Sequence, residues 1–157
     1  MKVIIRPLRE EDAYTSVKWR NDPEVFKFTG NTYDHVITIE SELEWIRKVI
    51  ANNKAGIEYR CAIEADGEYV GNIYLTDLPS KIGHYHIFIG NKDFWGKGIA
   101  KQASLLIIED GYKRFGLHDI ILNVRPENQR ALDLYRRLGF EEVGRDDKYI
   151  KMRYNRK

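Results

Sequence analysis

The sequence contains very little cysteine: Cys61 is the only one in 157 residues. A single thiol excludes a disulfide framework, a cysteine-rich zinc site and a Cys-x-x-Cys redox pair. The surrounding segment, "IEYRCAIEADGEYVGNIYL", is typical of β-strands, where a lone cysteine most often serves as a small core residue. We therefore expect Cys61 to be buried.

Net charge and long apolar runs are also lacking. The 26 Lys and Arg residues are nearly balanced by 24 Asp and Glu residues. The resulting net charge of +2 is far from the strongly basic character of many nucleic-acid binders and identifies no partner by itself. No stretch approaches the roughly 20 apolar residues of a membrane span, and "MKVIIRPLREED" becomes charged too early for a signal peptide. We expect a cytoplasmic protein without membrane or nucleic-acid partners.

The apolar content fits one hydrophobic core better than two. Hydrophobic residues make up 43% of the 157 positions and aromatic residues 12%, which is enough for one sizeable core. No repeat, linker or low-complexity stretch divides the chain. We therefore predict a single domain over residues 1–157.

Hydrophobic periodicity predicts the order of the secondary structure. A strand over "KVIIRPL" precedes a helix that stops at Asp22-Pro23, because the residue before a proline avoids the helical region. Apolar residues at helical spacing predict a second helix over 38–54, and Asp66-Gly67 suits a tight turn between two strands. The remaining predicted elements are a strand "GHYHIFIG", a helix from about Gly98 to Arg114, a strand "DIILNV", a helix "ENQRALDLYRRLG" and strands "FEEVG" and "KYIKMRY". This order predicts a mixed α/β (α+β) domain whose helices cover a largely antiparallel sheet.

The segment "FWGKGIAKQA" places two glycines and two lysines directly before a predicted helix. Three interpretations compete: a phosphate-binding helix start, an ordinary strand-to-helix turn and a basic loop for nucleic acid. The first N–H groups of a helix lack partners, the helix dipole adds positive charge, and glycine lets a ligand approach the backbone. Neither a P-loop ending nor a G-x-G-x-x-G spacing is present. The pattern therefore suits a diphosphate without matching either of those motifs.

From "IFIGNKDFWGKGIAKQA" through "NVRPENQRALDLYRRLGFEEVG", the chain resembles the GNAT superfamily of acetyl-CoA-dependent N-acetyltransferases. The segments "IIRPLREEDA" and "WRNDPEV" extend the similarity over nearly the whole chain. The similarity is greatest to the branch of spermidine, ribosomal-protein N-terminal and amino-sugar acetyltransferases. The resemblance implies the GNAT fold: a mixed, mostly antiparallel sheet, splayed between its fourth and fifth strands, with helices on both faces.

The resemblance also implies where acetyl-CoA binds. The family's pyrophosphate motif, Gln/Arg-x-x-Gly-x-Gly/Ala, matches residues 95–100, although Trp95 departs from the polar first position. The strand ending in Phe88 is expected to offer backbone groups to the pantetheine arm, and the pattern "N, six residues, Y, then GF" places an asparagine and a tyrosine near the cofactor. The residues assigned to acetyl-CoA, with no metal, are Phe88, Ile89, Gly90, Trp95, Gly96, Lys97, Gly98, Ile99, Ala100, Lys101, Asn128 and Tyr135.

Acetyl transfer to an amine makes two demands on the site. An alkylammonium group with a pKa of about 10 must lose a proton before its nitrogen can attack, and the sulfur of CoA leaves more easily when it is protonated. Tyr135, which stays protonated at neutral pH, is the candidate acid, and the alternative is a core aromatic on the apolar stripe of its helix. Asn128 also suits the N-cap of that helix, a role that does not exclude contact with the cofactor.

The candidate bases lie on "GHYHIFIG". Strand alternation puts His84, His86 and Phe88 on one face. Many GNAT relatives carry a glutamate near this point, and this strand has none. Each histidine is a candidate base acting through water, because imidazole titrates near neutral pH. The alternative for each is a surface or packing role.

The acceptor is expected near the two N-terminal helices and their loop. Aromatic residues with interspersed charges suit a polar ligand with a stackable part, such as a nucleotide-linked amino sugar. A polyamine would need a concentrated acidic site, and Glu40, Glu42 and Glu44 are more simply explained as a solvated helix face. The candidate substrate residues, with surface or core packing as the alternative, are Trp19, Arg20, Asn21, Phe28 and Tyr33.

These expectations combine into one functional hypothesis and its alternatives. The hypothesis is an N-acetyltransferase that moves acetyl from acetyl-CoA to a primary amine of a small molecule or a protein N-terminus, by direct attack in a ternary complex. The alternative from another class is a catalytically silent CoA-binding regulatory or sensor domain, and nucleic-acid binding ranks third. The helix containing "WIRKVI" and the terminal strands are candidates for a homodimer contact.

Overall fold

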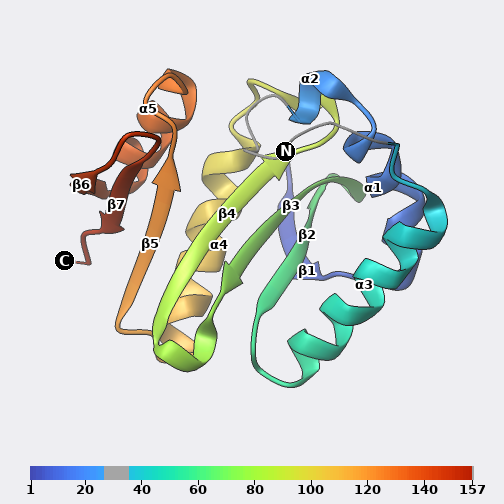
Figure 1. Ribbon diagram of the computed structural model, residues 1–157, viewed down its shortest axis with the longest axis horizontal. Coiled ribbons are helices and arrows are strands. Elements are labelled where there is room, and N and C mark those ends of the chain that lie inside the picture. The colour runs from blue at the N-terminus through green and yellow to red at the C-terminus, as the bar shows by residue number, and fades with distance from the viewer. Residues whose placement is uncertain (27–35, 157) are drawn as a thin grey trace.

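The computed structural model describes residues 1–26 and 36–156, and its elements follow the predicted order (Figure 1). The candidates Phe28 and Tyr33 lie outside the described residues. The strands are β1 (Val3–Pro7), β2 (Tyr59–Ala65), β3 (Glu68–Thr76), β4 (Ile82–Ile89), β5 (Asp119–Val124), β6 (Phe140–Arg145) and β7 (Ile150–Tyr154). The helices are α1 (Ala13–Arg20), α2 (Pro23–Phe26), α3 (Ile39–Lys54), α4 (Ile99–Lys113) and α5 (Gln129–Leu138), with 3-10 turns η1 (Glu10–Asp12), η2 (Leu78–Ser80) and η3 (Lys92–Phe94). The short α2 was not predicted; it begins at Pro23, whose fixed φ suits a first helical position.

Within the described residues, seven strands form one sheet in the order β1-β2-β3-β4-β5-β7-β6. Only β4 and β5 pair in parallel; the other neighbours are antiparallel. The turn between β2 and β3 has positive φ at both central residues, 51° at Asp66 and 84° at Gly67, as this tight hairpin requires. The predicted mixed, mostly antiparallel sheet is confirmed.

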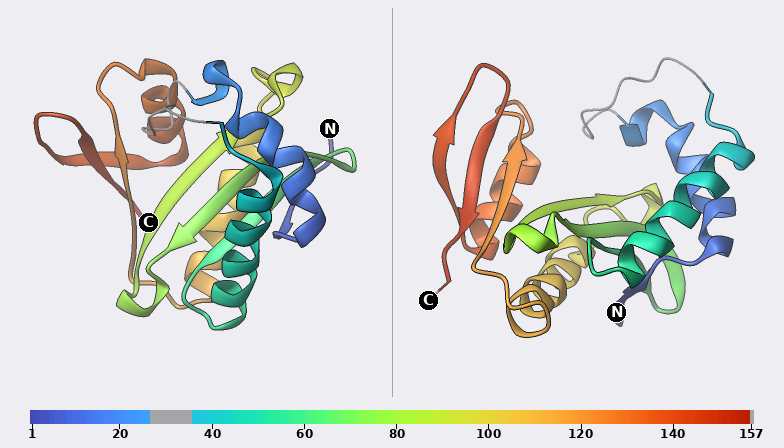
Figure 2. Two further views of the ribbon diagram at one scale, coloured as in Figure 1. Left: turned by 45° about the vertical axis from the view of Figure 1, so that its right-hand side comes forward. Right: turned by 60° about the horizontal axis from the view of Figure 1, so that its bottom comes forward.

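Helices cover both faces of the sheet, as predicted (Figure 2). Cys61 lies with no exposed surface in the core on the α4 side, so its predicted burial is confirmed. On the other side, Ile46 of α3 packs in a second core with Ala62 and Tyr74; we call this side the α1–α3 face. None of the helices in the two described ranges is long and apolar enough to cross a membrane.

The strands β4 and β5 run side by side only at their beginnings. Parallel pairing starts with Ile82 opposite Asp119 and ends with His84 opposite Ile121. Beyond this point the two strands diverge (Figure 1), while β4 remains paired with β3 as far as Ile89. The predicted splay between the fourth and fifth strands is confirmed. Within the described part of the chain, the β5 side of β4 therefore has no strand partner after His84.

The end of β4 is held by Trp19 of α1. This side chain is 8% exposed. The centroid of its ring lies 4.7 Å from that of Tyr69, and the ring lies edge-on to Phe88. A Cβ atom built on Gly90 would lie 2.0 Å from a ring carbon of Trp19. Glycine at this position is what allows the indole to lie directly against the chain that leaves β4.

We expect Gly90→Ala to lower the free energy of unfolding by about 2 to 3 kcal/mol, because the buried indole must move to admit the methyl group. Urea denaturation measures this change. Gly144→Ala in β6 is the matched control, since its Cβ meets nothing within 4 Å, and it should cost less than about 1 kcal/mol. Equal effects of the two substitutions would show that Trp19 does not fix the end of β4.

Candidate functional site

The loop before α4 reverses its direction at two glycines. Gly96 and Gly98 have φ angles of 75° and 77°, in the left-handed region that glycine adopts without strain. Gly98 is the N-cap of α4, and Ile99 begins the helix with its side chain 1% exposed in the core. The buried Ile99 anchors the helix start, so that the backbone of the loop faces outward.

The amide groups of this loop are free to bind a ligand. Within the described residues, the N–H groups of residues 96–101 find no hydrogen-bond acceptor. A Cβ built on Gly98 would meet nothing within 4 Å, so the approach to these amides is open. Successive outward N–H groups at a helix N-terminus form an anion site. The phosphate-binding interpretation of the loop is therefore the one that its geometry supports.

Three cations border the free amides. Lys97 and Lys101 are exposed within the loop and the first turn of α4. The third cation, Arg130 of α5, was missed by the sequence analysis: a Cβ built on Gly96 would lie 3.4 Å from its Nη2. Its place two residues after Asn128 at the start of a predicted helix was the available signal. Only the fold brings this guanidinium to the loop.

Trp95 occupies the first position of the motif, where the family has a polar residue, and its indole N–H makes a polar contact there. Its indole Nε1 donates a hydrogen bond to the carbonyl of Ile89 at 2.7 Å. The amide of Gly90 is also engaged, since it donates to the carbonyl of Val70 at 2.9 Å. These bonds tie the loop to the end of β4. A cofactor along β4 would therefore use other backbone groups of the unpaired stretch, such as those around Phe88.

Tyr135 projects from α5 toward β4. Its ring lies edge-on to Tyr85 of β4, at 5.6 Å between centroids and an interplanar angle of 87°, and 6.0 Å from Phe140. Burial raises the pKa of Tyr135 to about 12. The hydroxyl therefore stays protonated at neutral pH and is available as a proton donor. The apolar packing interpretation also holds for the ring, so the two interpretations are compatible.

A chain of hydroxyls ties the first turn of α4 to β4. Ser104 donates to the carbonyl of Ala100 at 2.6 Å, and the Tyr85 hydroxyl lies 2.5 Å from the same Ser104 oxygen. Because Ser104 has already donated its proton, Tyr85 is the donor in the second bond. The ring that supports Tyr135 is thus fixed to the helix that presents the amide loop.

Asn128 is the N-cap of α5. Its Oδ1 accepts a hydrogen bond from the amide of Ala131 at 3.2 Å. The capping interpretation is confirmed, and contact with the cofactor stays a prediction.

The two candidate bases lie on the α1–α3 face, in register with residues of β3. His84 has Nε2 3.9 Å from a carboxylate oxygen of Asp77. His86 lies 3.4 Å from the hydroxyl of Thr76. Although His86 keeps solvent-accessible surface, desolvation and the charge of Arg60 lower its pKa to about 4. His86 is therefore neutral at pH 7 and a weak base.

The described acceptor candidates have unequal freedom to bind. Trp19 is buried against Gly90. Asn21 bonds both backbone groups of Ile37, with Nδ2 donating to the carbonyl at 2.8 Å and Oδ1 accepting from the amide at 2.7 Å. Arg20 keeps 30% of its side chain exposed. Arg20 is the described candidate that is best placed to touch an acceptor.

The expectation of a solvated acidic face on α3 is wrong for Glu42. This residue is 1% exposed, and its Oε2 accepts a hydrogen bond from Ser16 of α1 at 2.7 Å. The helix turns Glu42 toward α1, where Arg20 lies 3.4 Å from Oε1. Burial raises the pKa of Glu42, and Ser16 and Arg20 oppose that rise.

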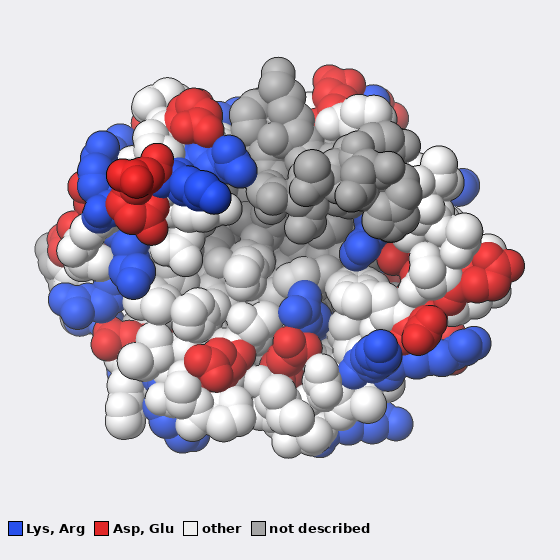
Figure 3. Space-filling model, viewed as in Figure 1, with Lys and Arg blue, Asp and Glu red and all other residues white. Residues whose placement is uncertain are grey.

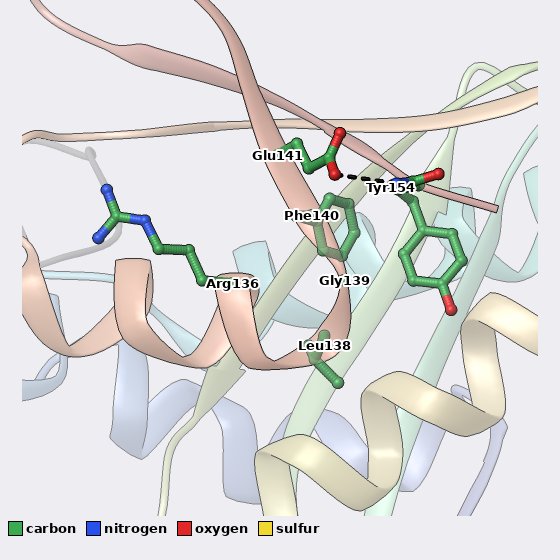
Figure 4. A pocket seen from close by; sticks show the side chains of 7 residues that line it. Arg136, Leu138, Gly139, Phe140, Glu141 and Tyr154 are labelled. Atoms are coloured by element: carbon green, nitrogen blue, oxygen red, sulfur yellow. Dashed lines mark hydrogen bonds between the residues drawn. The ribbon is translucent and has the colours of Figure 1, made fainter. Parts of the chain in front are cut away.

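A pocket of about 370 Å³ lies apart from these residues, where α5 ends against β6 and β7 (Figure 4). None of the predicted site residues lines it. Glu141 accepts a hydrogen bond from Asn155 at its rim, at 2.9 Å, and Arg136 points away from the other labelled side chains. The residues that line it are Arg136, Leu138, Gly139, Phe140, Glu141, Tyr154 and Asn155.

The chain thus combines a helix start with outward N–H groups, which suits an anion, with a diverging parallel strand pair and a protonated tyrosine. A family model described as "Acetyltransferase (GNAT) domain" matches residues 2–141. The chain belongs to this family of GNAT acetyltransferases.

Relatives share the fold over almost the whole chain. A spermidine N(1)-acetyltransferase of Escherichia coli strain K12 is 28% identical over 155 residues, covering 90% of this chain and 74% of the relative. The structure of spermidine N-acetyltransferase from Vibrio cholerae in complex with CoA and spermine has a TM-score of 0.81 at 22% identity, covering 96% of this chain and 92% of that one. The structure of ribosomal-protein-S5-alanine acetyltransferase from Vibrio fischeri has a TM-score of 0.85 at 18% identity, covering 98% of this chain and 92% of that one.

We expect Gly98→Ala to raise the Michaelis constant for acetyl-CoA about tenfold or more and to leave that for the amine nearly unchanged. The added methyl group projects into the open space in front of the amides and obstructs the diphosphate. Steady-state kinetics with each substrate varied in turn measures both constants.

Gly116→Ala is the matched control for Gly98→Ala. Gly116 also has a positive φ, 62°, and its Cβ also meets nothing within 4 Å. Both substitutions should cost about 1 kcal/mol of stability through backbone strain, and only Gly98→Ala should affect acetyl-CoA. A parallel rise of both Michaelis constants in Gly98→Ala would instead indicate a folding defect.

Proposed function

We propose that this protein is an N-acetyltransferase that moves acetyl from acetyl-CoA to a primary amine of a small molecule or a protein N-terminus. In this proposal the amine attacks the acetyl thioester directly in a ternary complex. The observation that carries the proposal is the row of unpartnered amides at residues 96–101 beside the diverging end of β4. The activities for which the relatives are named, on spermidine and on a ribosomal protein, support an amine acceptor.

The residues of the loop fit acetyl-CoA. Backbone N–H donors suit its diphosphate, and Lys97, Lys101 and Arg130 add positive charge at the rim. Bound acetyl-CoA supplies the activated acetyl thioester. On its β5 side, β4 has no strand partner beyond His84 among the described residues, so its backbone there suits an extended arm, much as a strand bonds its neighbour. Backbone N–H groups in this stretch also suit the negative charge that develops on the acetyl oxygen.

The acceptor's ammonium group must lose a proton on the α1–α3 face. His84 and His86 both face this side, and a carboxylate oxygen of Asp77 lies 3.9 Å from Nε2 of His84. His86 is neutral at pH 7, and its pKa of about 4 makes it a weak base. We propose that His84 takes up the proton through water, with His86 as a neutral hydrogen-bonding partner of the amine.

Tyr135 is the proposed proton donor to the sulfur of CoA. Its hydroxyl is protonated at neutral pH and is carried by a ring that Tyr85 and Phe140 hold in place. We propose that it donates its proton to the departing sulfur of CoA and regains one from solvent.

Release of free thiol from acetyl-CoA tests the proposed activity. We expect release that depends on a primary amine, with an acetylated amine as the product detected by mass spectrometry. The alternative, a silent CoA-binding sensor domain, would bind acetyl-CoA by calorimetry and release no thiol with any amine. Protein without added amine is the control for thioester hydrolysis.

We expect Tyr135→Phe to keep its fold and its affinity for acetyl-CoA but to lose roughly a hundredfold to ten-thousandfold in kcat, the usual worth of general-acid catalysis. The ring and its packing are retained, so thermal stability should change little. Tyr112→Phe, which removes a hydroxyl of α4 outside the site, is the matched control and should not alter kcat. A Tyr135→Phe enzyme within a few-fold of wild type at saturating substrates would leave solvent as the proton source.

A further inference from the structure

The α1–α3 face carries two arginines that stack against aromatic rings. The guanidinium carbon of Arg20 lies 5.2 Å from the ring centroid of Trp45, and that of Arg60 lies 6.0 Å from the same ring. Arg60 also lies over Tyr74, at 4.5 Å from its centroid. We call these four residues the arginine–aromatic wall.

The wall adjoins the candidate reaction site. In the sheet register, Arg60 lies opposite Tyr74 and Tyr74 lies opposite His86. Cross-strand partners point to the same side of a sheet, so the three side chains form a row on the α1–α3 face. His86 comes directly after the point where β4 parts from β5. An acceptor that approaches His86 on this face therefore meets the wall.

Carboxylates beside the wall are already engaged. Glu58 accepts two hydrogen bonds from Arg60, at 2.9 Å from Nε and 3.1 Å from Nη2. Glu42 is buried between Ser16 and Arg20. Figure 3 views this face and shows acidic and basic side chains standing side by side over the middle of the sheet. The acids here neutralise the protein's own arginines.

Two further acids near the wall are paired with another arginine. Glu64 and Asp12 both pair with Arg6 of β1. Asp77 follows the end of β3, is 59% exposed and lies beside His84. Among the residues that the structure describes, Glu42 and Glu58 beside the wall thus have arginine partners, whereas Asp77 lies beside His84 instead.

The charge of Arg60 is one of the causes that lower the pKa of His86. Burial is the main cause of the lowered pKa of His86, and the charge of Arg60 comes second. The opposing effect of Glu58 is smaller. Arg60, although paired with Glu58, thus contributes to the lowered pKa of His86.

We propose that the acceptor is a monoamine that also carries an anionic group, a phosphate or a carboxylate, and that the arginine–aromatic wall binds this group. A polyamine would bring additional positive charges against Arg20 and Arg60, whose neighbouring carboxylates Glu42 and Glu58 are already engaged. A guanidinium has five N–H groups and Glu58 takes two hydrogen bonds from Arg60, so further donors remain for an oxyanion. The proposal rests on the proposed acetyl transfer and narrows its acceptor, which thereby differs from the spermidine of two relatives.

The test compares amines that differ only in the anionic group. Glucosamine phosphate is paired with glucosamine, β-alanine is paired with propylamine, and spermidine is the polycation. For each amine, kcat/KM is measured by thiol release, and affinity for the CoA-bound protein is measured by calorimetry. We expect at least one anionic amine to exceed its uncharged partner tenfold or more in both measurements, with spermidine the poorest acceptor. The responding pair identifies phosphate or carboxylate as the recognised group.

Variants of the wall test the cause of this preference. Arg60→Met keeps an apolar stem over Tyr74 but frees the carboxylate of Glu58, so the preference should shift from the anionic amine toward spermidine. Combining Arg60→Met with Glu58→Gln removes both charges and should lose the anionic preference without the gain for spermidine. Arg47→Met on the exposed side of α3, where Arg47 pairs with Glu10 at 2.7 Å, is the control and should behave as wild type.

Each outcome has one meaning. Spermidine as the best acceptor of the wild-type protein, or equal values within both pairs, overturns the proposal even if the variants fail to fold. An absence of thiol release with every amine would refute the acetyl transfer instead, and the calorimetric ratio would still decide whether the wall prefers an anionic amine.

Discussion

The early end of the pairing between β4 and β5 is the constraint on which the site depends. Hydrogen bonds join the two strands only as far as His84 and Ile121. Beyond them, a group of aromatic rings that includes Tyr85, Tyr135 and Phe140 packs between β4 and α5. These rings join α5 to β4 beyond the end of the strand pairing. The ring of Tyr135 thereby lies beside β4 where its β5 side has no strand partner among the described residues.

The loop before α4 and the end of β4 are held as one unit. The indole of Trp95 bonds the Ile89 carbonyl, and Trp19 covers Gly90 from the other side. Ser104 and Tyr85 add a second tie between α4 and β4. A ligand that bonds both the amides of the loop and the edge of β4 therefore binds to parts whose relative position is already fixed, which lowers the entropic cost of binding.

On the α1–α3 face, several carboxylates are paired with arginines. Arginines of β1, β2 and α1 each neutralise carboxylates that would otherwise be free to bind an ammonium group. A protein can share the GNAT fold and about a quarter of its sequence with spermidine acetyltransferases and still offer a different surface to the acceptor. The charged side chains that meet across helices and strands can vary while the fold stays the same.

The sequence by itself determined the order of the elements, the hairpin at Asp66-Gly67, the glycine-rich start of α4 and the cap at Asn128, because each depends on neighbouring residues or on a period of two or 3.6. Only the tertiary structure decided that Arg130 borders the loop, that Trp19 lies on Gly90 and that Glu42 is buried against Ser16. These contacts join residues that are distant in the chain, and hydrophobic periodicity records which face of an element is buried but not which partner covers it. The acidic pattern of α3 predicted solvent for Glu42 because local sequence carries no information about the helix packed beside it.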